Sequence, residues 1–219
     1  MIDKFLKKID EKEKIFFIQI GANDGIIFDH LYKYARKDKW EGILIEPVIE
    51  TYLDLKKNYS GSKNLNFLNL AISNKNEDKE IYYIPKSKIK ENNLNISLKG
   101  CSTFHKNRQG DSSIKMRVFE NIEHLKTQNV KCITSEKLIK ENKIEKIDLL
   151  QIDAEGHEHI IITSFPFNKV KPSVVIFETN RRKKVFSDKQ LTEMFDTLKE
   201  NGYSIIELDQ DTIAYLKSK

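Results

Sequence analysis

The chain is poor in cysteine and has no long hydrophobic run. Its 219 residues include two cysteines, Cys101 and Cys132, which are too few for a disulfide framework and lack a paired zinc-type spacing. No apolar run approaches the ~20 residues that a membrane span needs. Hydrophobic residues make up 39% and charged residues 32% of the chain, a balance typical of globular proteins. We therefore expect a cytoplasmic protein with free thiols, no membrane span and no secretory leader.

Glycine is also scarce, and two of the eight glycines bound a short loop after the first apolar run. Residues 15–20 (IFFIQI) predict a buried strand, and GANDG follows at 21–25. A strand, a glycine-bearing turn and a helix, here predicted to start near Ile26, present backbone N–H groups to a ligand. The full G-x-G-x-x-G spacing of dinucleotide sites is missing, because Asn23 stands where a middle glycine is expected. This favours a cofactor without phosphates, such as S-adenosylmethionine.

Apolar runs alternate with helical patterns along the chain, which predicts an α/β fold with a mostly parallel sheet and helices on both faces. The expected strands are 15–20, 42–46, 65–71, 81–84, 130–133, 147–152 and 174–177, with a terminal hairpin after Gly202. The expected helices are 2–13, 26–37, 47–59, 135–141, 157–164 and 188–200. We expect one domain over residues 1–219.

The alternation stops at residues 86–127, which are polar and poorly periodic. A segment this long inside a compact domain is often a lid or a substrate-binding insert. If it folds over the cofactor, the hydroxyl groups of Ser102 and Thr103 would reach it. His105 and His124 in this insert are expected to be exposed.

Polar groups follow several of the predicted strands, at the sheet edge where α/β proteins bind ligands. Glu46 ends the second strand, 21 positions after Gly25, and is predicted to hold ribose hydroxyls. Ala71, Ile72 and Ser73 end the third strand. The candidate cofactor-binding residues are Gln19, Gly21, Ala22, Asn23, Asp24, Gly25, Glu46, Pro47, Ala71, Ile72, Ser73 and Asp153.

The densest titratable cluster, DAEGHEH at 153–159, follows the predicted strand 147–152. It is either a polar helix N-terminus, where the helix dipole favours acids, or a catalytic site containing Asp153, Glu155 and His157. In the second case His157 or Asp153 would remove a proton from a substrate hydroxyl. Asp153, Glu178 and Asn180 offer oxygen ligands for a divalent cation such as Mg²⁺.

The formal net charge is +5, but acids and bases are mixed along the chain, so a nucleic-acid partner is not favoured. The exception is RRKK at 181–184, which is either a solvated loop or a site that attracts an anionic substrate.

Four segments resemble the FkbM family of S-adenosylmethionine-dependent methyltransferases. They are IQIGANDG at 18–25, ILIEP at 43–47, LNLAISN at 68–74 and LLQIDAEGHE at 149–158. The resemblance implies a Rossmann-like class I methyltransferase fold with a seven-stranded sheet whose last strand is antiparallel. It also implies methyl transfer to a hydroxyl of a sugar, polysaccharide precursor or natural product.

By the same resemblance, residues 21–25 would surround the methionine portion of the cofactor, Glu46 would bind the ribose, and residues 71–73 would lie near the adenine. One position departs from the family pattern. Gln19 stands where an acid is common, so the contact to the cofactor's ammonium group would be weaker or made by an amide oxygen. The alternatives are a nicotinamide-dependent oxidoreductase, a nucleic-acid methyltransferase and a non-catalytic partner subunit. The oligomeric state and the acceptor are not predicted.

Overall fold

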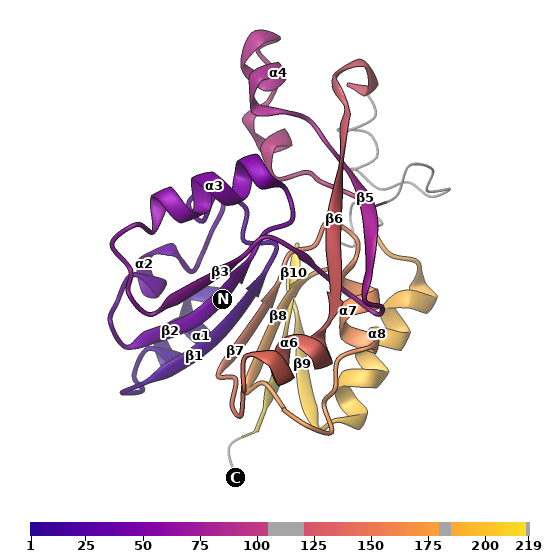
Figure 1. The fold of residues 1–219 in the computed structure, drawn as a ribbon. Helices are drawn as coiled ribbons and strands as arrows, with labels where there is room; N and C mark the ends of the chain where they lie inside the picture. The colour runs from indigo at the N-terminus through magenta and orange to yellow at the C-terminus, as the bar shows by residue number, and fades with distance from the viewer. Residues whose placement is uncertain (105–120, 180–184, 218–219) are drawn as a thin grey trace.

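The computed structural model describes residues 1–104, 121–179 and 185–217. Its main element is a seven-stranded sheet in the order β3-β2-β1-β7-β8-β10-β9 (Figure 1). The strands are β1 (Ile15–Ile20), β2 (Trp40–Ile45), β3 (Leu65–Leu68), β7 (Leu149–Ile152), β8 (Val174–Glu178), β9 (Tyr203–Glu207) and β10 (Asp211–Leu216). The first five strands are parallel to one another, and β10 runs antiparallel between β8 and β9. The predicted fold class is confirmed.

Helices cover both faces of this sheet because alternate strand residues are apolar on both sides. Phe17, Leu44 and Leu149 pack against α1 (Ile2–Ile9), α2 (Tyr32–Ala35) and α3 (Ile49–Asn58). Their strand neighbours Ile18 and Leu150 face α6 (Ser135–Glu141), α7 (Glu158–Thr163) and α8 (Asp188–Glu200). The two hydrophobic cores cover the two faces of the sheet. A ligand site can form at the edge where the parallel strands end.

A second, three-stranded sheet has the order β4-β6-β5. Its strands are β4 (Ala71–Ser73), β5 (Glu77–Tyr83) and β6 (Lys126–Thr134). Figure 1 shows β5 and β6 as a long pair extending away from the main sheet. Ile72 and Ile133 join the core of the main sheet, so both sheets share a hydrophobic interior.

The insert predicted at 86–127 connects β5 to β6. Its described part contains α4 (Lys86–Glu91) and two 3₁₀ turns, η1 (Ile96–Lys99) and η2 (Ile122–His124). Thr103 and Tyr82 exchange backbone hydrogen bonds of 2.8 and 2.9 Å, which return the chain to β5. His105 was expected to be exposed and lies outside the described residues. His124 was also expected to be exposed, but its side chain is only 18% exposed.

Several element predictions are confirmed. Helix α8 has the predicted bounds, with Ser187 and Gln190 forming a capping box, and Gly202 follows at φ 92°. Thr134 caps α6 through a 3.1 Å bond from the Lys137 N–H.

The helix predicted at 2–13 ends at Ile9, and the strand predicted at 81–84 is Glu77–Tyr83. Two further element predictions were wrong in kind. The helix expected at 26–37 is reduced to α2, because Phe28 has φ 59° and the Asp29 carboxylate accepts the Leu31 N–H, both incompatible with a continuous helix. The strand expected at 65–71 stops at Leu68, and Ala71 begins a strand of the second sheet. Among the described helices, none is long and apolar enough to cross a membrane.

Candidate active site

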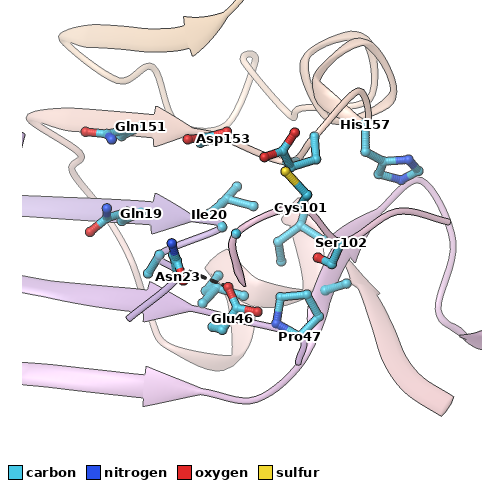
Figure 2. Close-up of a pocket in the computed structure, with 18 of the residues that line it drawn as sticks. Gln19, Ile20, Asn23, Glu46, Pro47, Cys101, Ser102, Gln151, Asp153 and His157 are labelled. Carbon is cyan, nitrogen blue, oxygen red and sulfur yellow. Dashed lines mark hydrogen bonds between the residues drawn. The ribbon is translucent and has the colours of Figure 1, made fainter. Parts of the chain in front are cut away.

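A cavity of about 330 Å³ lies at the carboxyl ends of β1, β2 and β7 (Figure 2). This size is at the lower end of the roughly 300–1,000 Å³ typical of small-molecule sites. Loops after these strands form one wall, and the described part of the insert contributes Ser97, Gly100, Cys101, Ser102 and Phe104. The hydroxyl-bearing Ser102 is among them, and the role of the insert as a lid or substrate-binding segment stays a prediction.

The loop at 21–25 is shaped by close backbone approaches. Gly21 has φ 76°, and a Cβ atom there would lie 1.7 Å from the backbone oxygen of Asp153, so only glycine fits. Asn23 has φ 47° and takes the left-handed conformation expected of the missing middle glycine, which asparagine tolerates better than most residues. The loop therefore keeps its turn without a third glycine.

The Glu46 carboxylate is buried at the cavity wall and holds this loop in place. Its Oε2 accepts the Asn23 N–H at 3.0 Å, and its Oε1 accepts the Val48 N–H at 2.9 Å. Burial raises the pKa of Glu46 to about 7, although the two backbone donors oppose the shift. Each oxygen keeps a lone pair for a further donor, as ribose binding requires.

Asp153 reaches the same cavity from the end of β7, where it is solvent-accessible through the opening. Its position inside the fold, followed by the nearby carboxylates of Glu178 and Asp211, raises its pKa to about 7. A carboxylate with this pKa can both accept and release a proton near neutral pH.

Glu158 joins Asp153 and Glu178 in a tight group of carboxylates, with one oxygen of each lying within 4.8 Å of the others. Sequence reasoning placed Asp153 and Glu178 in a metal site with Asn180, which lies outside the described residues. Glu158, however, accepts the N–H groups of Ala154 at 2.6 Å and Gly156 at 2.8 Å. Burial and the two neighbouring acids raise the pKa of Glu158 to about 8, so it keeps its proton at neutral pH. The metal site stays a prediction.

His157 is buried at the edge of the cavity. Its Nε2 lies 3.1 Å from Ser73 Oγ, and its ring lies 5.1 Å from that of Phe104. Ser73 belongs to the segment predicted to lie near the adenine. This position makes His157 part of the wall between β4 and the insert.

The comparison of the chain with protein families identifies its class. Residues 19–205 match the family described as the methyltransferase FkbM domain. The chain belongs to the FkbM methyltransferase family. No match was found among curated protein sequences.

Two solved methyltransferase structures are similar to this chain. The FkbM methyltransferase of Methylobacillus flagellatus KT has a TM-score of 0.53 and 11% identity, and the match covers 93% of this chain and 44% of that protein. The precorrin-6y C5,15-methyltransferase of Geobacter metallireducens GS-15 has a TM-score of 0.48 and 9% identity, covering 98% of this chain and 87% of that one. At 11% identity, the first of these two structures shows a similar fold and indicates no substrate.

The residues of this FkbM protein fit a cationic cofactor such as S-adenosylmethionine. Among the described residues that line the cavity there are four acids, Asp29, Glu46, Asp153 and Glu155, and no lysine or arginine. Apolar side chains line one part of the cavity, those of Pro47, Leu70, Ala71, Ile72 and Ile81. Gln19, Gly21, Ala22 and Asn23 line it as well, and cofactor binding by these residues stays a prediction.

Three predicted cofactor residues, Asp24, Gly25 and Ser73, are absent from the described cavity lining. Asp24 instead accepts hydrogen bonds from the Ile26 and Ile27 N–H groups and pairs with Lys99 at 2.7 Å. Lys99 also pairs with Asp54 at 2.9 Å, which ties the insert to the loop and to α3. Gly25 faces the Tyr59 ring. These residues shape the site without facing it.

Sequence reasoning missed Asp29, Gln151 and Gln210, which all line the cavity. A glutamine inside the otherwise apolar strand LLQI was a usable signal, because a buried amide needs a partner. Asp29 could not be found, because the expected helix placed it on a regular helical surface. The basic run at 181–184 lies outside the described residues, and its attraction for an anionic substrate stays a prediction.

Proposed function

We propose that this FkbM protein is an S-adenosylmethionine-dependent O-methyltransferase that acts on a hydroxyl group of a sugar, polysaccharide precursor or natural product. The observation that carries the proposal is the position of Asp153, a carboxylate that follows β7, lines the cavity and lies against the loop at 21–25. The cofactor supplies a methyl group on a positively charged sulfur.

Asp153 would take the proton from the acceptor hydroxyl whose oxygen receives the methyl group. The loop at 21–25 and Glu46 would position the cofactor, and this positioning supplies much of the rate. Glu155 also lines the cavity and would help to orient the acceptor. His157 is the weaker candidate for the base, because it contacts Ser73 on the predicted adenine side.

A second hollow supports an acceptor of the sugar type. It shares Phe28 and Ser97 with the main cavity and is otherwise lined by Leu94, Leu98 and three asparagines. The Phe28 side chain is 78% exposed and is held in a left-handed backbone conformation at φ 59°. Such strain in a bulky residue is often found at functional sites. A flat ring beside the amides of Asn93 and Asn95 suits a ring-shaped polyhydroxyl ligand.

The test is methyl transfer to a panel of free sugars, nucleotide-linked sugars, oligosaccharides and RNA, with acceptor products detected by mass spectrometry. We expect a sugar hydroxyl to be methylated. Asp153→Asn should remove turnover while S-adenosylhomocysteine still binds, whereas His157→Ala should weaken that binding several-fold. Methylation of RNA alone would refute the sugar assignment. Full turnover by Asp153→Asn would refute the assignment of the base.

A further inference from the structure

The main cavity and the second hollow meet at Phe28 and Ser97, the two described residues that line both. Phe28 belongs to the loop before α2 and Ser97 to η1 of the insert, so segments far apart in the sequence form this passage. The main cavity measures about 330 Å³ and the second hollow about 720 Å³. The larger space therefore lies beside the cavity that is expected to hold the cofactor.

The two spaces differ in their acidic groups. Asp153 and Glu155 line the main cavity, and neither is among the described residues of the second hollow. An acceptor hydroxyl that gives its proton to Asp153 therefore lies in the main cavity. A cavity of this size, at the lower end of the roughly 300–1,000 Å³ typical of small-molecule sites, leaves room beside a cofactor for only a small part of the acceptor. The remainder of a larger acceptor would pass between Phe28 and Ser97 into the second hollow.

The second hollow suits an uncharged group with several hydroxyls. Its described lining consists of Phe28, Ser97, two leucines and three asparagines, and it includes no ionisable side chain. Amide groups both donate and accept hydrogen bonds, as hydroxyl groups do. Asn95 Oδ1 accepts the Ser97 N–H at 2.9 Å, which fixes the orientation of this amide and leaves its Nδ2 donors to a ligand. An anionic group would meet no cation in this lining, and four acids line the neighbouring cavity.

Phe28 gives the second hollow a flat apolar surface. Its side chain is 78% exposed, although a phenyl ring gains free energy when it is removed from water. The preceding turn is held by Asp24, whose carboxylate accepts the Ile26 and Ile27 N–H groups at 3.0 and 2.9 Å. Phe28 itself has φ 59°, an uncommon conformation for a bulky residue. A sugar ring that stacks on this phenyl group would cover it, and the hydroxyls at the edge of the ring would reach the amides.

We propose that the second hollow binds an uncharged sugar unit next to the unit that is methylated, and that Phe28 is the residue on which it stacks. The acceptor then has at least two units. A hydroxyl of the first unit lies near Asp153, and the second unit lies among the asparagines. Phe28 is thus a specificity-determining residue that selects acceptors by length. This inference rests on the proposed function, because it assumes that a sugar hydroxyl receives the methyl group.

The test measures methyl transfer from S-adenosylmethionine to glucose, galactose, mannose, rhamnose and fucose, and to the di- and trisaccharides of each, with products quantified by mass spectrometry. For the sugar that is methylated, the wild-type protein should have a kcat/KM about tenfold or more higher for the disaccharide than for the monosaccharide, because only the longer acceptor reaches the phenyl ring. Phe28→Ala should reduce this ratio to about twofold or less, whereas Phe28→Trp, which keeps an aromatic surface, should retain it. S-adenosylhomocysteine titration by calorimetry checks that each variant still binds the cofactor product.

Ile96→Ala is the matched control. Ile96 is 55% exposed and lies in the same turn as Ser97, but it is not among the described residues that line either space, so the ratio should stay as in the wild type. Asn93→Gly gives a second measurement in case Phe28→Ala folds poorly. Asn93 has φ 51°, which glycine also adopts, so the variant loses the amide and keeps the backbone. Its ratio should fall about threefold or more, as expected for a lost hydrogen bond.

The possible results separate this inference from the proposed function. Equal use of mono- and disaccharides by the wild type, or a ratio that Phe28→Ala and Asn93→Gly leave unchanged, would overturn the second sugar site while sugar methylation stands. A preference for disaccharides that contain glucuronic acid, used as charged probes, would overturn the assignment of an uncharged unit. If the wild-type protein methylates no sugar of any length, the proposed function is wrong and this inference is wrong with it.

Discussion

Replacing Gly21 by alanine should destabilise the protein and damage the site together. At φ 76° an alanine costs roughly 1–2 kcal/mol relative to glycine. Its Cβ would also lie 1.7 Å from the Asp153 backbone oxygen, and side-chain rotation cannot relieve an overlap with the backbone. Overpacking of this kind costs typically about 1–3 kcal/mol. We therefore expect a loss of roughly 2–5 kcal/mol, which lowers the Tm by about 4–20 °C in a chain of this size.

Gly61→Ala is the matched control. Its Cβ would meet no atom within 4 Å, and its φ is not positive, so the substitution should be neutral or stabilise by up to about 1 kcal/mol. Urea unfolding of both variants measures the difference. S-adenosylhomocysteine titration of folded Gly21→Ala should show weakened binding, because the end of β7 must shift to admit the methyl group. Equal unfolding free energies for the two variants would show that the strands do not approach as closely as described.

Two further predictions concern charges around the site. Lys99→Ala should lower the free energy of unfolding in urea by about 2–4 kcal/mol, because it leaves the buried Asp24 carboxylate without its cation. The control Lys86→Ala should lower it by less than about 1 kcal/mol, since the Lys86 and Asp54 side chains are 36% and 31% exposed. Equal costs would contradict the buried bridge. Glu46→Gln should flatten the pH dependence of stability, because the folded pKa of about 7 lies above the usual 4.5. Glu46 then contributes a loss of stability to the unliganded protein as the pH rises from about 4.5 to 7, because the carboxyl group ionises more readily in the unfolded chain. Thermal unfolding across this pH range should show that this loss is absent in Glu46→Gln.

The parts of the site that could be predicted from the sequence are those that local patterns determine. Apolar runs gave β1, β2, β7 and β8, and the carboxyl ends of parallel strands meet at one edge whatever the loops do. Glu46 and Asp153 therefore face one cavity, as their places after apolar runs predicted. The antiparallel hairpin of β9 and β10 could also be predicted from the sequence, because Asp209 and Gln210 separate two strand-like runs.

The parts that could not be predicted depend on contacts between distant segments. Ala71 leaves the main sheet because β4 pairs with β6, about sixty residues later in the chain. Asp29 enters the cavity because Phe28 adopts a left-handed backbone, a conformation that no propensity scale assigns to phenylalanine. Asp24 was expected to bind the cofactor, since nothing near it in sequence reveals that Lys99 would neutralise it.

Two of the acidic residues that line the cavity share one physical property, a raised pKa. Burial disfavours the ionised forms of Asp29 and Glu46, and raises the pKa of each. A cation that enters such a cavity restores the ionised forms, so binding and deprotonation reinforce each other.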